Sequence, residues 1–195
     1  TAVVDVMTVH LGDGVHLYEN GIVSFLNQPA ADCGVERGMS VRDAAELLLE
    51  RDPIVASASE ITNRTVMNTS PDGRHVIATD SIAFGTDEDV DTNVLVTAGH
   101  TGRSSVEHLR RCRPWGFISS DGGRGLDDSG MAGLFIVEAD GLAGATVDAT
   151  RARMGSGLSH YHDGIISAVN APAHDRGVEI GMGVPQAASL LLLNG

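Results

Sequence analysis

Apolar runs alternate with amphipathic segments through the middle and the end of the chain. Four near-continuous apolar runs have the length and β-branched content of buried strands, and they lie at 76–84, 94–100, 115–121 and 141–149. Apolar residues at helical spacing fill segments 101–114 and 129–140. This alternation predicts an α/β fold: a single Rossmann-like parallel sheet with helices on both faces.

The first quarter of the chain has a different pattern, which returns at the end. Residues 1–52 align with 144–195 without a gap, at a constant offset of 143, and 24 of the 52 aligned positions are identical. We therefore expect a duplicated tail that forms the same structure twice. The predicted organisation is an N-terminal copy at 1–52, followed by an α/β domain at 53–195 that ends in the second copy, 144–195.

Each copy predicts a strand, a Gly-rich turn and two helical segments. The amphipathic segments 22–34 and 165–177 have helical spacing, and each ends at a glycine, Gly34 or Gly177, that suits the C′ position of a helix. Ser40 suits the N-cap of the next helix. The copies are therefore predicted to be strand-turn-helix-helix units.

The packing of two parts of the chain stays open. A tail without its own central sheet must bury its apolar face beside its twin or on a neighbouring subunit, so the first copy is either an appendage or an arm that packs on a partner. Either arrangement predicts a homo-oligomer. Residues 53–75 are either a further strand or an irregular crossover, and the sequence at 70–75 predicts a turn.

Composition excludes several classes of function. A net charge of −13 repels phosphate backbones, so we expect no nucleic-acid partner. All thirteen basic residues are arginine, so the chain has no lysine for a pyridoxal-phosphate Schiff base or for a P-loop. No GxGxxG motif is present, which argues against NAD. The sequence favours no cofactor and leaves a divalent metal possible.

The two cysteines and the apolar stretches bear on the compartment. Cys33 and Cys112 lie in helical patterns without a CxxC or metal-site spacing, so we interpret both as structural thiols in a reduced environment. No stretch is long and apolar enough for a membrane span, and the start does not resemble a signal peptide. These features predict a cytoplasmic protein without a membrane partner. Thr1 is either an autoprocessed nucleophile or the residue left after removal of an initiator Met.

Polar residues gather where the predicted strands end. They are Asp80 and Ser81, then Gly99, His100 and Thr101, then Ser119, Ser120 and Asp121, and finally Asp148. Ligands of an open parallel sheet bind beyond the carboxyl ends of its strands, so this rim is a candidate site. The same residue types also form turns and cap helices, which is the alternative interpretation.

The segment AGHTGRSS (98–105) carries the first candidate group. His100 is the best general acid or base in the chain, because the reference pKa of histidine lies near neutrality. Gly99, Thr101, Gly102 and Arg103 stand at a predicted helix start, where free N–H groups and a guanidinium could bind a carboxylate or a phosphate of the substrate.

The segment SSDGGRGLDDSG (119–130) carries the second group. Asp121 is the predicted partner of His100 or a second base. Gly122, Gly123, Arg124 and Asp128 are candidate substrate-binding residues, and the pair Asp127 and Asp128 could bind a divalent cation. The alternative is a long flexible loop in which Asp128 only caps the next helix.

The second copy carries charges that the first copy lacks. Arg151 and Arg153 follow a strand end at alternate positions and could clamp a dicarboxylate, whereas the first copy has Thr8 and His10 there. Weak candidates for a metal site are the HxH pair and the aspartate next to it: His160, His162 and Asp163. They are weak because the sequence shows no further ligands to complete a metal site.

Two hypotheses about function follow. The first is a small-molecule enzyme of the hydrolase, lyase or isomerase type that acts on an anionic metabolite, most simply a carboxylate, by general acid/base chemistry. The second is a non-catalytic ligand-binding or oligomeric assembly module, which the duplicated tail favours.

Overall fold

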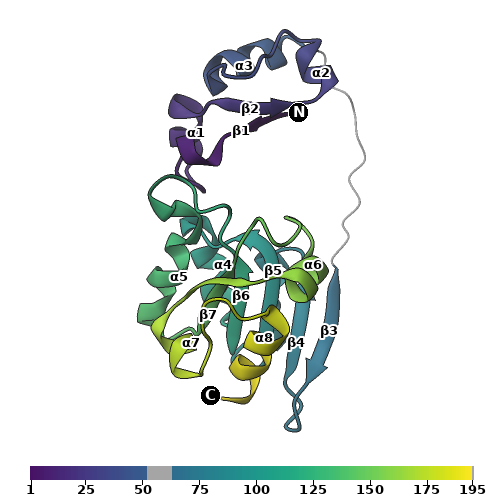
Figure 1. Cartoon of the computed structure of the whole chain (residues 1–195), viewed down its shortest axis with the longest axis vertical. Coiled ribbons are helices and arrows are strands. Elements are labelled where there is room, and N and C mark those ends of the chain that lie inside the picture. Colours follow the sequence, from purple (N-terminus) through teal and green to yellow (C-terminus); the bar gives the residue numbers. More distant parts are fainter. Residues whose placement is uncertain (52–62, 195) are drawn as a thin grey trace.

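The computed structural model describes residues 1–51 and 63–194 (Figure 1). It consists of a small N-terminal lobe, residues 1–51, and an α/β domain, residues 63–194. We call the first part lobe 1. A loop of lobe 1 contacts the rim of the α/β domain near Ser129, where Leu11 N donates a hydrogen bond to Ser129 Oγ at 3.0 Å.

The α/β domain is built on one six-stranded sheet. Its strands are β3 (Arg64–Thr69), β4 (His75–Thr79), β5 (Val94–His100), β6 (Gly116–Ser120), β7 (Gly144–Val147) and β8 (Ile166–Val169). They lie in sequence order, with β4 to β7 parallel and with β3 and β8 antiparallel to their neighbours. The predicted α/β character is confirmed, and the prediction of a wholly parallel sheet is wrong at both edges.

Local structure explains both antiparallel edges. Strands β3 and β4 are joined by a tight turn, in which Ser70 N donates to Arg74 O and Gly73 has a φ of +88° that favours glycine. Strand β8 follows a helix of only seven residues, α6 (Gly157–Asp163), which lies against the end of β4 instead of crossing to the other end of the sheet. The strand order also lacks the reversal that creates a ligand crevice in a Rossmann sheet.

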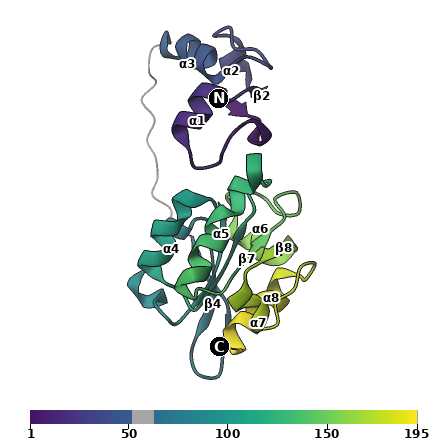
Figure 2. The same ribbon diagram turned by 90° about the vertical axis from the view of Figure 1, so that its left-hand side faces the viewer.

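Helices cover both faces of the sheet (Figures 1 and 2). Helices α4 (Val106–Cys112) and α5 (Ala132–Ile136) pack on one face around Leu95, Leu109 and Phe117. Helices α6, α7 (Ala171–Asp175) and α8 (Val184–Leu193) pack on the other face, with Val96, Ile118 and Leu191. Short 3-10 helices complete the domain: η2 (Ile82–Phe84), η3 (Asp87–Asp89), η4 (Arg103–Ser105), η5 (Leu126–Met131) and η6 (Val137–Asp140).

Lobe 1 has a small core of its own. Its elements are β1 (Ala2–Val4), η1 (Val6–Thr8), α1 (Gly14–Asn20), β2 (Val23–Leu26), α2 (Gln28–Ala31) and α3 (Val41–Leu49). Strands β1 and β2 form a two-stranded antiparallel sheet, and α3 packs on it around Val23, Ala30, Val35 and Ala44. As predicted, Ser40 caps α3, because its Oγ accepts a hydrogen bond from Asp43 N at 3.1 Å.

The structure corrects the predicted helices at 22–34 and 165–177. Each segment begins as a strand, β2 or β8, and only its second half is helical. The β-branched starts pair with β1 and β7, and Asn27 or Asn170 then caps the short helix that follows. The helices α1 and α6 were not predicted, because both begin at the glycines that had indicated turns.

Backbone pairing is the same in lobe 1 and in residues 144–194, which we call the C-terminal unit. Ala2 lies opposite Leu26, and Ala145 lies opposite Val169. In both strand pairs the register shifts between the second and the third paired residue of the first strand. Isolated bridges join Ile22 to Ser40 and Ile165 to Gly183. Each pairing in the C-terminal unit therefore has numbers 143 higher than its counterpart in lobe 1.

Among residues 1–51 and 63–194, no helix combines the length and the apolarity that a membrane crossing requires. The expected strand or crossover at 53–75 is partly described: 64–69 is strand β3, whereas 53–62 lie outside the described residues.

Candidate functional site

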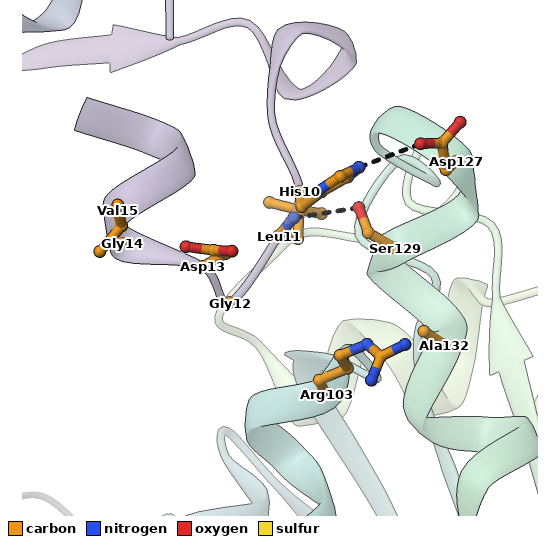
Figure 3. Close-up of a pocket in the computed structure, with 10 residues that line it drawn as sticks. All are labelled: His10, Leu11, Gly12, Asp13, Gly14, Val15, Arg103, Asp127, Ser129 and Ala132. Atoms are coloured by element: carbon orange, nitrogen blue, oxygen red, sulfur yellow. Dashed lines mark hydrogen bonds and ion pairs between the residues drawn. The ribbon is translucent and has the colours of Figure 1, made fainter. Parts of the chain in front are cut away.

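A pocket of about 730 Å³ lies between lobe 1 and the α/β domain (Figure 3). We call it the junction pocket. One wall is the Gly-rich segment of lobe 1 between η1 and α1, and the other comes from η4 and the 121–130 loop with η5. Its lining residues are His10, Leu11, Gly12, Asp13, Gly14, Val15, Arg103, Asp127, Ser129 and Ala132.

Glycines in the 121–130 loop make room for lobe 1. A Cβ atom added at Gly122, Gly125 or Gly130 would lie 3.0–3.2 Å from Leu11 Cδ1. Backbone contacts hold the same junction, because Leu126 N donates to Val9 O at 3.1 Å. These glycines therefore serve the fit of lobe 1 and the packing of the α/β domain itself, since the Cβ atoms added at Gly122 and Gly125 would lie closer still to His100 Cβ at 2.8 Å and to Ser129 Oγ at 2.9 Å.

An imidazole–carboxylate pair spans the junction. His10 Nε2 lies 3.0 Å from Asp127 Oδ2, and the two residues come from different parts of the molecule. The His10 ring stacks on His16 with centroids 4.2 Å apart, and His16 N donates to Asp13 Oδ1 at the start of α1. A carboxylate oxygen accepts hydrogen bonds, so in this pair His10 donates through Nε2 and its Nδ1 is the ring nitrogen that does not face Asp127.

Backbone strain accompanies this pair. Three non-glycine residues in the loop have φ values in the left-handed region: Arg124 at 69°, Asp127 at 54° and Asp128 at 55°. Such conformations cost about 1–3 kcal/mol each and tend to cluster at functional sites. A hydrogen bond of 2.7 Å from Arg124 Nε to Asp128 Oδ1 holds the loop and lowers the pKa of the Asp128 carboxyl. Asp127 is thereby presented to His10.

Arg103 supplies a positive charge on the opposite wall. It is exposed at the start of η4, and Figure 3 shows its guanidinium across the pocket from the His10–Leu11 segment. Within residues 1–51 and 63–194, no carboxylate forms an ion pair with it. The anion-binding role expected for Arg103 stays a prediction, and its guanidinium has no carboxylate partner among the described residues that would compete with a ligand.

His100 lies beside the pocket but does not line it. Its Nδ1 accepts a hydrogen bond from Gly102 N at 3.0 Å, and burial lowers the pKa of its imidazole. Asp121 is nearly buried, and its Oδ1 accepts from Gly123 N at 2.9 Å and Ala149 N at 3.0 Å. No hydrogen bond joins His100 to Asp121 in the described part of the chain, so the predicted pair is not assembled here.

Most other predicted rim residues are engaged by the fold. Asp80 accepts from Gly157 N and from Asn63 Nδ2, and Ser81 caps η2. Thr101 is fully buried and donates to Ser120 O. The N–H of Gly122 donates to Ser120 Oγ. Only Gly99, next to His100, has open space around it.

The charged residues of the C-terminal unit lie away from the junction pocket. Arg151 and Arg153 are both exposed, and Arg151 lies in a turn that follows β7. Arg153 lines a second hollow of about 370 Å³ with Ser156, Leu158, Ser159, His162 and Asp163. The predicted dicarboxylate clamp therefore has no place in the junction pocket.

The HxH pair lies on helix α6. His160 is fully buried and bonds to Ser156 O at 3.1 Å, whereas His162 is exposed. Asp163 accepts a hydrogen bond from Ser159 Oγ. No group of three or more metal-ligating side chains is present in 1–51 and 63–194.

Sequence reasoning missed His10, Asp13 and His16 as site residues. Their one signal was a difference between the aligned segments, since Arg153, Ser156 and Ser159 stand at the corresponding positions. The pairing of His10 with Asp127 joins residues 117 positions apart, which no local motif could indicate.

The chain matches no known protein family, and comparisons with curated proteins and with solved structures find no match.

Proposed function

We propose that the chain is a small-molecule enzyme that acts on a carboxylate-bearing metabolite in the junction pocket by general acid/base chemistry. The observation that carries this proposal is the His10–Asp127 pair at 3.0 Å, which lines the same pocket as the uncompensated Arg103. The reaction belongs to the hydrolase, lyase or isomerase type, and His10 takes the proton-transfer role that the sequence had suggested for His100.

The geometry supports a division of roles. Arg103 binds the substrate carboxylate, His10 Nδ1 removes or returns a proton, and Asp127 orients the imidazole and stabilises its charged form. Asp13 adds a second carboxylate to the lining, so the pocket suits a monocarboxylate better than a dicarboxylate, which like charges would repel.

We also infer that lobe 1 and the C-terminal unit are two copies of one structural unit. Their equal offset in sequence and in backbone pairing supports this, as does the equal capping of α2 and α7 by Asn27 and Asn170. On this view the site belongs to the first copy, where a histidine replaces Arg153. A reducing cytoplasmic setting accords with the two free cysteines. Burial raises the pKa of the Cys112 thiol to about 11, so this thiol is unreactive and structural.

A thermal-shift titration tests the proposal. The ligands are propionate, malonate and, as a control without a carboxylate, propylamine, all at matched ionic strength. Propionate is expected to raise the melting temperature saturably, malonate to raise it less, and propylamine to leave it unchanged. Arg103→Gln should abolish the propionate effect, whereas the matched control Arg151→Gln, an exposed arginine outside the pocket, should keep it.

The catalytic role needs a second measurement. Once a carboxylate that is turned over is known, His10→Gln should lower kcat by about 100-fold or more, because general acid/base catalysis contributes about 10²–10⁴-fold. His100→Ala should keep most of the activity. If His100→Ala abolishes turnover while His10→Gln retains it, the assignment to the junction pocket is wrong.

A further inference from the structure

Helix α3 of lobe 1 repeats the apolar face of α8 but is covered less completely. Five residues of α8 are exposed by 2% or less: Val184, Ala187, Ala188, Leu191 and Leu192. They pack against the sheet beside Val94, Val96 and Ile118. The aligned residues of α3 are identical: Val41, Ala44, Ala45, Leu48 and Leu49. Leu49 is nevertheless 82% exposed. Lobe 1 thus leaves partly uncovered an apolar face whose counterpart in the C-terminal unit is buried against the sheet.

Strand β1 shows the same difference. Its counterpart β7 pairs in parallel with β6, from Phe117 opposite Gly144 to Ser120 opposite Val147. In the described structure β1 pairs with β2 alone, so its other edge is open. Val3 is 47% exposed where Thr146 is fully buried. The edge carries neither proline nor a charge, the usual protections of an unpaired strand.

A glycine gives independent support. In the C-terminal unit, a Cβ at Gly157 would lie 2.6 Å from the carbonyl carbon of Thr79, so packing on the end of β4 requires glycine there. Its counterpart Gly14 has no atom within 4 Å of the same point and no positive φ. Nothing in the described structure requires a glycine at position 14, whereas a strand end packed there in the manner of Thr79 would.

Thr1 indicates that strand β6 of a second copy does not supply the missing sheet. Thr1 aligns with Gly144, where an added Cβ would overlap the Phe117 ring. A strand beside β1 must therefore carry a residue smaller than phenylalanine at the position of Phe117. Strand β6 of a second copy fails this condition, and its own β7 already occupies that edge.

We propose that lobe 1 is a docking unit for the open edge of a further parallel α/β sheet, which residues 63–194 do not supply. The partner strand pairs in parallel with β1, has a small residue opposite Thr1, and belongs to a sheet whose apolar face covers α3. Burial of β1 and α3 in the manner of β7 and α8 is the driving force.

A designed extension of the full chain serves as the probe. Residues 63–143, with Phe117 replaced by glycine in that added segment only, are joined ahead of Thr1, as residues 63–143 stand ahead of Gly144. Amide hydrogen exchange is measured at Ala2, Val3 and Val4. The extension is expected to slow exchange there by at least about 100-fold, which brings it close to that of Ala145–Val147. The matched control keeps Phe117 in the added segment and should give little protection.

Three results would overturn the proposal. One is fast exchange at Ala2–Val4 with either residue in the added segment, since lobe 1 then does not accept such a sheet. The second is equal protection with phenylalanine and with glycine, which would remove the argument from Thr1. The third is a dimer of the unextended chain, detected by light scattering, in which Ala2–Val4 are already protected, because a second copy would then cover this edge.

Discussion

Lobe 1 and the C-terminal unit have the same strand pairing, the same asparagine cap on α2 and α7 and nearly half of their residues in common, yet they differ in burial. Leu192 is 2% exposed in one and Leu49 is 82% exposed in the other. Local sequence therefore sets the elements and their connections, whereas the neighbouring sheet decides what each apolar residue contributes to stability. A comparison of equivalent residues separates these two effects within one molecule.

The largest expected effect comes from a buried ion pair in the α/β domain, a feature that the described structure of lobe 1 lacks. Arg64 bonds in bidentate fashion to Asp89, which is fully buried. Burial alone would raise the pKa of Asp89, but bonds from Arg64, Thr86 and Asn93 outweigh it and lower the pKa. Arg64→Ala should lower the free energy of unfolding of the α/β domain by about 4 kcal/mol, because it leaves the buried carboxylate of Asp89 without its partner. Urea unfolding, followed by a signal from the α/β domain, provides the measurement.

The pH dependence of this pair has a definite sign. Since the folded-state pKa of Asp89 is depressed, its pair stabilises the domain above the ordinary carboxyl pKa and loses that contribution as pH falls through the folded-state pKa. Acid should therefore weaken β4 before β1, as measured by hydrogen exchange, and Arg64→Ala should flatten the dependence. An Arg64→Ala variant that is as acid-sensitive as the parent would contradict this assignment.

A smaller effect is expected from the equivalent leucines. Leu192→Ala should cost about 3 kcal/mol, since truncation of a buried leucine loses burial and leaves a cavity. Leu49→Ala should cost less than about 0.5 kcal/mol, because the side chain is exposed. Urea unfolding of both variants provides the measurement. Equal costs would mean that α3 is already covered in solution.

The smallest effect concerns the equivalent glycines and changes sign. Gly157→Ala should destabilise the protein by about 2 kcal/mol, because the new methyl group overlaps the backbone of Thr79. Gly14→Ala should stabilise lobe 1 by about 0.5 kcal/mol, since alanine favours the helix and meets no neighbour. Melting temperatures of the two variants should move in opposite directions; a loss of stability in Gly14→Ala would show that this glycine is already packed.

The sequence predicts best those elements in which one pattern dominates. The apolar run at 94–100 forms β5 over those same residues, and Ser40 caps α3 as expected. The prediction of one helix at 22–34 was wrong, because the apolar residues of the strand IVSFL and of the short capped helix after it have helical spacing when taken together. The antiparallel edges depend on a turn at Ser70–Arg74 and on the path of α6, which periodicity does not encode.

The candidate site was harder to predict than the fold. Arg103 was identified because it follows a Gly-rich strand end, a local signal. His10 and Asp127 meet only because lobe 1 packs on the 121–130 loop through Leu11, and that packing is a tertiary event. Asp121 and Thr101 matched the pattern of site residues, but they are occupied by backbone partners. Residue type at a strand end thus finds the rim without separating ligand groups from structural ones.

The most direct test of the site is a propionate titration followed by NMR of the histidine side chains. The junction pocket predicts saturable shifts of the His10 and His16 imidazole resonances, loss of those shifts in Arg103→Gln, and little change at His108 or His162. Saturable binding that moves His100 or His162 and leaves His10 unchanged would contradict the account and place the site on the rim of the sheet or on α6.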